Sequence, residues 1–523
     1  MQKLPLFLRM LLRRSRKGPP ARYDVRWTPA VPVPAADGVS LLTDHYAPVT
    51  DDPCPTVLLR APYIRSGFPW NYLYGALFAE QGFRVLLQSS RGTGGSGGDF
   101  HFWRNERADA QATVAWLREQ EWFTGDFFTL GPSYTAYTQW TLAADPPPEW
   151  RGAIMQVGFT DPHAFFYPGD VFALERSLVG GLALFNQALT SGDLVKGVIR
   201  MRRHLKRVTT GVPLLDVYPP MFGGRRPAFE EWLSSPDADD DAWKGAALTD
   251  TPDVPVSLST GWWDLVPEQV IDQYARLRDA GRDVDLIIGP WTHTSSLEGG
   301  WAELFAQAMR RMRGEPPVFR VRAHVGGVNE WRDFPDWPPP GVRELRLHLG
   351  DGTLGETPGG KSTTFRYDPA DPTPSIGGAL QSPTQGQRDN APLEKRADVV
   401  LFTGPALTEA VEVLGPVRAE FAATTTAASG DLFARLCDVD PDGKSINVCD
   451  GLARIVDGRT VVEMAHTAHR FRPGHRVRLL VAGGAHPRYL RNYGTGEPPG
   501  PATRMVATET TVAHDSALIL SVV

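Results

Sequence analysis

Short apolar runs alternate with helical spacing over the first third of the chain. The runs are PTVLLRAPY (55–63), FRVLLQSSRG (83–92), FFTL (127–130) and GAIMQVG (152–158). Continuous apolar runs of this length are typical of strands that are buried on both faces of a sheet. Between the second and the third run, residues 105–119 have helical spacing, with one face near Ala108, Thr113, Trp116 and Leu117. Strands that alternate with helices predict a largely parallel α/β sheet.

The pattern is helical from about residue 160 to 245. FALERSLVGGLALFNQAL and DLVKGVIRMRRHLKRV have apolar positions at helical spacing, and the basic residues of the second segment are expected to form a solvated face. Strand-like runs resume with VPVSLSTG (254–261) and LIIGP (286–290). A helical block inserted between two strands of one sheet predicts a cap above the sheet.

After about residue 340 the helical spacing almost disappears. The short β-type runs there are ELRLHLG, TTFRYDP, DVVLFTG, VEVLGPVRAEFAA, LFARLCDV, ARIVDG, HRVRLLVAG and ALILSVV. Their regular spacing between Gly, Pro and Asp predicts a β-sandwich or jelly roll. With 523 residues, the chain is long enough for several domains. We expect an α/β domain in two parts (1–150 and 246–340), a helical cap (151–245) and a C-terminal jelly roll (341–523).

Three residues with catalytic chemistry each follow one of the strand-like runs. Ser133 comes after FFTLGP, Asp264 after VPVSLSTGWW and His293 after DVDLIIGPWT. A serine on a sharp turn between a strand and a helix is typical of the nucleophile elbow of α/β-hydrolases, because the helix start aims N–H groups at the same point. Serine, acid and histidine at strand ends, in this order, match the triad of that fold. We therefore expect an α/β-hydrolase domain with Ser133 as its nucleophile.

The elbow departs from the pattern Gly-x-Ser-x-Gly. Thr135 stands in the place of the second glycine, and Ala136 follows it. These two residues leave open a catalytically inactive binding protein on the same fold. Alternative candidates for the acid and the base are Asp253, Asp283, His163 and His324.

Composition limits the partners and the compartment. The net charge of −6 gives no reason to expect nucleic acid. Cys54, Cys437 and Cys449 resemble neither a disulfide framework nor a zinc site, so buried free thiols and a reducing, cytoplasmic location are expected. The N-terminal segment MQKLPLFLRMLLRRSRKGPP lacks a cleavage site and is too short to span a bilayer, which favours a local helix over contact with a membrane surface.

Several motifs in one order resemble a known family. They include RAPYIR, QSSRGTGGSGG, EQEWFTGDFFTLGPSYTA, STGWWD, GPWTH, NEWRDFPDWPPP and, in the β-rich part, YDPADPTPSIGG, DLFARLCDVDPDGKS and FRPGHRVRLLVAGGAHPRY. The chain resembles the cocaine esterase branch of the X-Pro dipeptidyl-peptidase type serine hydrolases from about residue 22 to its end. The resemblance implies a catalytic α/β domain, an inserted helical cap and a C-terminal jelly roll. It also implies an oxyanion site formed by the hydroxyl of Tyr63 and the N–H of Tyr134.

These observations together predict a serine hydrolase that cleaves small carboxylic esters, or amides, through an acyl-enzyme. The chemistry requires no metal and no organic cofactor. The residues expected to line an apolar acyl pocket are Phe165, Phe166, Tyr167, Trp262, Trp263 and Val266. An X-Pro dipeptidyl-peptidase, an aminopeptidase-like enzyme and an α-amino acid ester hydrolase or acylase are alternatives, and they need acidic groups such as Asp161 or Asp170 near the serine to bind an ammonium. A homodimer is possible, and stable membrane insertion is not expected.

Overall fold

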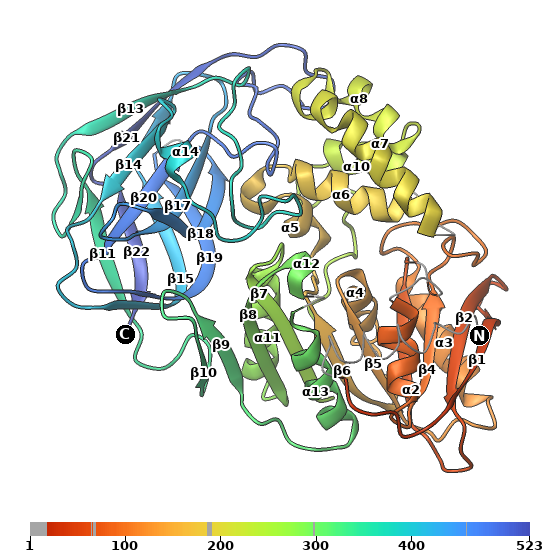
Figure 1. The fold of residues 1–523 in the computed structure, drawn as a ribbon. Coiled ribbons are helices and arrows are strands. Elements are labelled where there is room, and N and C mark those ends of the chain that lie inside the picture. Colours follow the sequence, from red (N-terminus) through yellow and green to blue (C-terminus); the bar gives the residue numbers. More distant parts are fainter. Residues whose placement is uncertain (1–17, 64, 66–69, 186–190, 297–298, 457) are drawn as a thin grey trace.

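The computed structural model describes residues 18–63, 65, 70–185, 191–296, 299–456 and 458–523. Three parts are visible in Figure 1: a sheet flanked by helices, a group of helices above it, and a β-rich domain at the C-terminal end of the chain. The fold class predicted from the sequence, an α/β-hydrolase domain with a helical cap and a C-terminal β-domain, is confirmed. The N-terminal segment for which a local helix was expected, residues 1–17, lies outside the described residues.

A ten-stranded sheet forms the catalytic part, with the strand order β1-β2-β4-β3-β5-β6-β7-β8-β9-β10. The strands are β1 (Val25–Pro34), β2 (Ser40–Pro48), β3 (Thr56–Ala61), β4 (Arg84–Ser89), β5 (Phe127–Pro132), β6 (Trp150–Gln156), β7 (Val256–Trp263), β8 (Val284–Thr292), β9 (Val321–Val325) and β10 (Glu330–Phe334). The pairs from β4 through β3, β5, β6, β7 and β8 to β9 are parallel, while β1, β2 and β10 pair antiparallel at the two edges. The carboxyl ends of the parallel strands therefore meet at one edge of the sheet.

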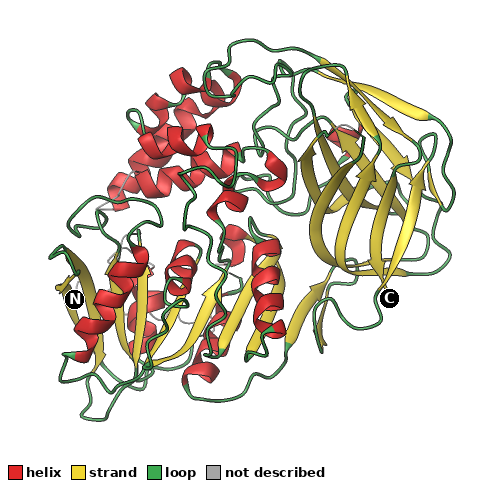
Figure 2. Cartoon of the chain, turned by 180° about the vertical axis from the view of Figure 1, so that it is seen from behind, coloured by secondary structure: helices red, strands yellow, loops and turns green. Residues whose placement is uncertain are grey.

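Helices cover both faces of this sheet (Figures 1 and 2). The apolar side chains of α3 (Glu106–Arg118), α4 (Tyr134–Trp140) and α11 (Pro267–Asp279) belong to one hydrophobic cluster with the sheet. Those of η1 (Asn71–Ala76), α2 (Leu77–Ala79) and α13 (Trp301–Met312) belong to another cluster, which packs against different side chains of the same strands. The central strands are buried on both faces for this reason, as their continuous apolar runs predicted.

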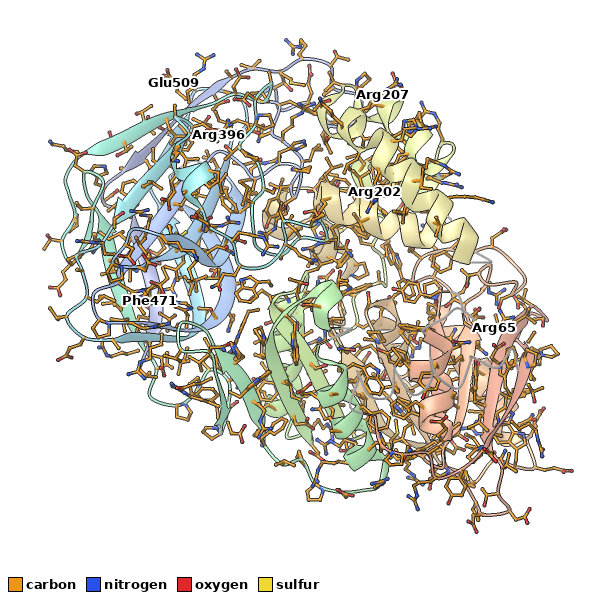
Figure 3. All side chains as sticks on the ribbon, in the orientation of Figure 1. Arg65, Arg202, Arg207, Arg396, Phe471 and Glu509 are labelled. Atoms are coloured by element: carbon orange, nitrogen blue, oxygen red, sulfur yellow. The ribbon has the colours of Figure 1, made fainter. Side chains whose placement is uncertain are left out.

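The segment between β6 and β7 is helical and lies above the carboxyl edge of the sheet (Figure 1). Its helices are α5 (Pro162–Phe166), η2 (Pro168–Asp170), α6 (Leu174–Phe185), α7 (Ser191–Thr210), α8 (Leu214–Val217), α9 (Pro219–Phe222) and α10 (Pro227–Ser234). The basic residues of α7 are exposed, as expected, at Arg202, Arg203, Lys206 and Arg207. Figure 3 labels two of them, Arg202 and Arg207, on the cap.

The C-terminal domain is built from antiparallel sheets of five, four and three strands. The strands are β11 (Arg343–Leu349), β12 (Leu354–Gly355), β13 (Ser362–Tyr367), β14 (Val399–Thr403), β15 (Val411–Phe421), β16 (Ala423–Thr425), β17 (Asp431–Val439), β18 (Ser445–Arg454), β19 (Thr460–Phe471), β20 (Arg476–Ala482), β21 (Thr508–Ala513) and β22 (Ala517–Val522), with one short helix, α14 (Ala391–Glu394). The inward side chains of the two larger sheets share one apolar core. Sheets that pack face to face over a common core are typical of a jelly roll.

Some details differ from the sequence-based expectation. In α3, Ala108 is exposed, whereas Glu106 and Asp109 are buried because they pair with Arg60 and Arg91. The run ARIVDG contributes only its first two residues to a strand, the end of β18. Cys54, Cys437 and Cys449 are free and buried, as expected. Among the helices of the described residues, none combines the length and the apolarity that crossing a bilayer requires.

Candidate active site

Ser133 occupies a strained turn between β5 and α4. Its φ and ψ are 56° and −128°, a conformation that a residue with a Cβ adopts rarely and at a cost of about 1–3 kcal/mol. The turn is held in place because the Ser133 N–H donates to the carbonyl oxygen of Gln156 on β6, at 2.8 Å. The first helical residue, Tyr134, follows at once, so the start of α4 lies directly behind the serine.

The side chains of Asp264, His293 and Ser133 form one hydrogen-bonded chain. His293 Nδ1 lies 2.6 Å from Asp264 Oδ1, and His293 Nε2 lies 3.2 Å from Ser133 Oγ. Asp264 is fully buried after β7, where its carboxylate also accepts hydrogen bonds from the Thr260 hydroxyl at 2.8 Å and the Leu265 N–H at 2.6 Å. An acid held this firmly fixes the tautomer of the histidine, which leaves Nε2 free to accept the serine proton.

Two donors meet beside the serine hydroxyl. The Tyr63 hydroxyl, which follows β3, lies 3.5 Å from Ser133 Oγ. Burial raises the pKa of Tyr63 above its usual value, while hydrogen bonds with Ser133 and with the N–H of Tyr134 act in the opposite direction. The phenol is therefore a neutral donor at neutral pH, and it converges with the Tyr134 N–H on one side of Ser133. That pairing suits the charge of an oxyanion.

The packing of the elbow accounts for its unusual residues. A Cβ added to Gly131 would lie 2.2 Å from the Thr135 methyl carbon, and a Cβ added to Gly158 would lie 2.5 Å from the Ala136 Cβ. Thr135 and Ala136 thus fill the space over two glycines on the neighbouring segments. In each contact the glycine, Gly131 or Gly158, lies on the side of the sheet, and the larger residue lies on α4. The helix can therefore still pack closely against the strands.

A cavity of about 250 Å³ opens at the serine. Its walls are mostly aromatic. The described residues that line it are Tyr63, Trp70, Phe102, Trp103, Pro132, Ser133, Tyr134, Phe159, Phe165, Phe166, Val179, Gly180, Gly181, Trp232, Leu265, His293 and Gln381. The predicted pocket residues Phe165 and Phe166 are among them. This set contains no Asp, Glu, Lys or Arg side chain.

The other predicted pocket residues have different surroundings. Tyr167 is buried in the cap, where its hydroxyl donates to the carbonyl oxygens of Trp232 and Leu233. Val266 is buried directly before α11. Trp262 and Trp263 line a second cavity, which is described below. None of the four is among the described residues that line the cavity at Ser133, because neighbours in sequence on a strand end or a helix point in different directions.

The cavity also contains residues that sequence reasoning missed. Trp103 has a positive φ of 55°, and two hydrogen bonds hold it: its N–H donates to the Tyr134 hydroxyl at 2.9 Å, and its indole N–H donates to the Ala242 carbonyl at 3.0 Å. Gln381 comes from the C-terminal domain, where its backbone N–H donates to the carboxylate of Glu175 on α6, at 3.2 Å. Neither residue belongs to a motif at a strand end, so the chain order carried no signal for them.

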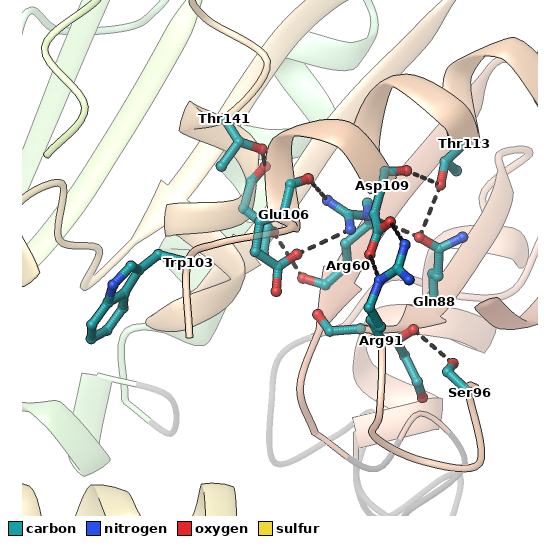
Figure 4. Close-up of polar contacts among 12 residues, drawn as sticks. Arg60, Gln88, Arg91, Ser96, Trp103, Glu106, Asp109, Thr113 and Thr141 are labelled. Carbon is teal, nitrogen blue, oxygen red and sulfur yellow. Dashed lines mark hydrogen bonds and ion pairs between the residues drawn. The ribbon is translucent and has the colours of Figure 1, made fainter. Parts of the chain in front are cut away.

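Buried ion pairs hold the loop that carries Trp103 (Figure 4). Arg60 on β3 contacts the Glu106 carboxylate at 3.0 Å, and Arg91 contacts Asp109 at 2.7 Å. Burial raises the pKa of Glu106, and the Arg60 guanidinium opposes that shift. These contacts attach the start of α3 to the sheet directly after the loop.

The alternative candidates have partners elsewhere. Asp253 pairs with Arg282, and Asp283 pairs with Arg311. His163 contacts the Pro236 carbonyl, and His324 contacts the Asn329 side chain. Asp161 accepts the Ala164 N–H as the N-cap of α5, and Asp170 lies at the second cavity.

Comparisons with known proteins agree with this architecture. Residues 37–295 match the family of the X-Pro dipeptidyl-peptidase (S15 family), and residues 312–519 match the X-Pro dipeptidyl-peptidase C-terminal non-catalytic domain. A cocaine esterase from Rhodococcus sp. (strain MB1 Bresler) is 30% identical over 89% of this chain and 92% of the relative. Among solved structures, an aminopeptidase from a marine sediment Thaumarchaeota archaeon has a TM-score of 0.80 at 20% identity, covering 96% of this chain and 97% of that one. An α-amino acid ester hydrolase has a TM-score of 0.78 at 19% identity, covering 97% and 98%.

Proposed function

This chain belongs to the X-Pro dipeptidyl-peptidase (S15) family of serine hydrolases, and we propose that it cleaves carboxylic esters of neutral, apolar acyl groups with Ser133, His293 and Asp264 as its triad. The observation that carries this proposal is the continuous hydrogen-bonded chain from Asp264 to Ser133 at the mouth of an aromatic cavity. The relative with 30% identity is an esterase by name, which supports an ester as the substrate.

The reaction proceeds in two halves. His293 Nε2 takes the proton of Ser133 as its oxygen attacks the ester carbonyl, and the carbonyl oxygen becomes an oxyanion. The Tyr63 hydroxyl and the Tyr134 N–H donate hydrogen bonds to that oxygen. His293 then gives its proton to the alcohol that leaves, and the acyl group remains on Ser133. Water, activated by His293, attacks the acyl-enzyme and releases the carboxylic acid.

The charge of the cavity favours neutral acyl groups over those with an ammonium. An aminopeptidase or an α-amino acid ester hydrolase has to compensate a buried positive charge with a carboxylate. The described lining contains no carboxylate, and Asp161 and Asp170, the earlier candidates, are used elsewhere. Esters with aromatic or aliphatic acyl groups are the better substrates for this reason, and X-Pro dipeptides are the second candidate because of the family.

A fluorophosphonate probe and a short ester panel test the proposal. The probe should label the wild-type protein, and Ser133→Ala should lose both the label and the hydrolysis of p-nitrophenyl butyrate while its circular dichroism is unchanged. His293→Ala and Asp264→Asn should each lower kcat by several orders of magnitude, without adding to the effect of Ser133→Ala. Turnover near the wild-type rate in Ser133→Ala would refute the role of this serine. Faster hydrolysis of an alanyl ester than of the matched propionyl ester would overturn the preference for neutral acyl groups.

Three further expectations stay predictions. The buried free thiols support a cytoplasmic location. The domain borders near residues 150, 245 and 340 and a homodimer are to be tested by limited proteolysis and by light scattering.

A further inference from the structure

A second cavity, of about 330 Å³, lies where the sheet, the cap and the C-terminal domain meet. Its size is within the range of small-molecule sites. Trp262, Trp263 and Asp264 contribute from the end of β7, Arg176 from α6, and Arg488 from the C-terminal domain. The catalytic reaction leaves most of these residues unused.

Arg176 is a buried cation without an acidic partner. Its side chain is almost fully enclosed, with 7% of the residue exposed. Within the described part of the chain, one hydrogen bond of its guanidinium is found, from Nη1 to the Phe165 carbonyl at 2.6 Å, and no carboxylate lies within ion-pair distance. Burial lowers the pKa of Arg176 to about 10, so the group is still charged at neutral pH. A buried charge of this kind is costly unless an anion compensates it.

The neighbouring arginine adds to the positive charge. Arg435 and Arg488 share one carboxylate, that of Asp450, and both pairs are buried. Two guanidinium groups on one carboxylate leave one positive charge in excess. Arg488 also lowers the pKa of Arg176 through repulsion, which places the two cations near each other.

The acidic groups near Arg176 are bound to other donors or exposed to water. The oxygens of Asp264 are taken by His293, Thr260 and the Leu265 N–H. Glu268 accepts the His466 backbone N–H at 2.6 Å, and 43% of its side chain is exposed to water. Asp170 and Glu463 are exposed to water. Glu175 is buried next to Arg176 in the sequence; burial raises its pKa, Arg488 opposes that shift, and its carboxyl accepts the Gln381 N–H at 3.2 Å. Glu175 offsets part of the positive charge, but the Arg176 guanidinium still has no carboxylate at ion-pair distance in the described part of the chain.

We propose that this second cavity binds a small monocarboxylate with an apolar tail, its carboxylate on Arg176 and its tail against Trp262 and Trp263. The planar fork of a guanidinium matches a carboxylate through two parallel hydrogen bonds. A single guanidinium without a carboxylate partner suits a monoanion better than a phosphate dianion. The two indole rings give the apolar part of the ligand a surface to pack against.

Binding at Arg176 is coupled to the catalytic cavity. The Arg176 guanidinium lies over the Phe165 ring, 4.8 Å from its centroid, and donates to the Phe165 carbonyl, while Phe165 lines the cavity at Ser133. Leu265 lines both cavities. A carboxylate on Arg176 thus acts on the wall that holds the acyl group. A regulatory role of this site rests on the proposed function, because the acid that ester hydrolysis releases is itself a monocarboxylate with an apolar tail.

Isothermal titration of the full-length protein with benzoate tests the site without catalysis. Benzoate should bind to the wild type and equally to Ser133→Ala, and Arg176→Gln should raise its Kd at least tenfold. The matched control is Arg202→Gln, an exposed arginine of the cap (Figure 3), which should leave the Kd unchanged. Benzamide, which has the same ring without the charge, and inorganic phosphate should bind at least tenfold more weakly than benzoate.

A second readout covers the case in which Arg176→Gln does not fold. Arg176→Lys keeps the charge but loses the fork, so its Kd for benzoate should rise several-fold. Trp263→Phe should reduce the change in tryptophan fluorescence on adding benzoate. Benzoate that does not bind at millimolar concentration, a Kd that Arg176→Gln or Arg176→Lys leaves unchanged, or phosphate that binds as well would overturn the proposal. A protein that binds benzoate at Arg176 but hydrolyses no ester would contradict the proposed function and leave this site standing.

Discussion

The Tyr63 hydroxyl lies beside the serine of the proposed triad. It lies 3.5 Å from Ser133 Oγ, and under the proposed function a developing oxyanion beside Ser133 accepts hydrogen bonds from this hydroxyl and from the Tyr134 N–H. Tyr63→Phe keeps the ring and its edge-to-face contact with Trp70. We expect kcat for p-nitrophenyl butyrate to fall by roughly 10²–10³ with little change in KM, because the lost hydrogen bond is made mainly in the transition state. Steady-state kinetics that show an unchanged kcat would remove Tyr63 from this role.

The contact between Ala136 and Gly158 offers a residue-scale test of the elbow. A methyl group added at Gly158 would lie 2.5 Å from the Ala136 Cβ, which is too close for two carbons. Gly158→Ala should therefore lower the free energy of unfolding by about 1–3 kcal/mol, as overpacking does. Adding Ala136→Gly moves the methyl to the other side of the contact and should restore most of the stability. Calorimetry on the two single variants and the double variant measures this coupling, and a double variant no more stable than Gly158→Ala would contradict the packing argument.

At the scale of the element, side chains of the C-terminal domain form hydrogen bonds with the last carbonyls of α7. The last carbonyls of this helix have no partner within it. The Arg491 Nη2 group donates to the Thr210 carbonyl at 2.7 Å and contacts that of Gly211 at 3.3 Å, while His486 Nε2 lies 2.7 Å from the Thr209 carbonyl. A cation at this end is also favoured by the helix dipole.

Arg491→Met should loosen the cap. The substitution removes the donor to the part-buried carbonyls of Thr210 and Gly211, so we expect a loss of about 0.5–1.5 kcal/mol and faster tryptic cleavage within α7. Arg470→Met, at a half-exposed arginine of β19, is the control and should change neither quantity. Equal cleavage rates in wild type and Arg491→Met would show that α7 does not depend on this contact.

Some features of these helices and strands could be predicted from the sequence, and others could not. The central strands and the order of Ser133, Asp264 and His293 could be predicted, because buried parallel strands have continuous apolar runs and the triad residues follow them. The face of α3 was predicted only in part: Thr113 and Leu117 are buried, but Ala108 is exposed, and Glu106 and Asp109 are buried through partners on distant segments. Trp103 and Gln381 could not be found for a related reason: long-range contacts place them at the cavity, and no local spacing records such contacts.

At the scale of the whole molecule, a histidine joins the hydrolase sheet to the C-terminal domain. The indole N–H of Trp337 donates to His466 Nδ1 at 3.1 Å, and the backbone N–H of His466 donates to the Glu268 carboxyl at 2.6 Å. Accepting a hydrogen bond at Nδ1 requires a neutral imidazole. Burial lowers the pKa of His466 to about 4, below its ordinary value of 6.5, while Asp272 and Glu463 oppose the shift.

The junction should therefore weaken in acid. Because the folded pKa is the lower one, this contribution to stability is complete above pH 6.5 and is lost as the pH falls toward 4. At pH 5 the loss for His466 is about 2 kcal/mol by this linkage. His466→Gln keeps an acceptor for Trp337 but does not titrate, so its unfolding temperature should fall less than that of the wild type between pH 7 and pH 5. Parallel curves for the two proteins would show that His466 does not titrate in this range.

Gln381 lies late in the sequence, so the cavity at Ser133 is completed late during synthesis. The ribosome completes the proposed triad with His293, yet the wall to which Gln381 belongs is made only later, in a domain that also has to fold. At about 5–20 residues per second, the chain from His293 to Gln381 takes roughly 4–18 s to emerge. A nascent chain in that interval holds Ser133 and His293, the proposed nucleophile and base, beside an incomplete cavity. Selectivity toward substrates thus arises after the reactive groups are in place, and a prematurely terminated chain would retain the chemistry without the full means of choosing what it acts on.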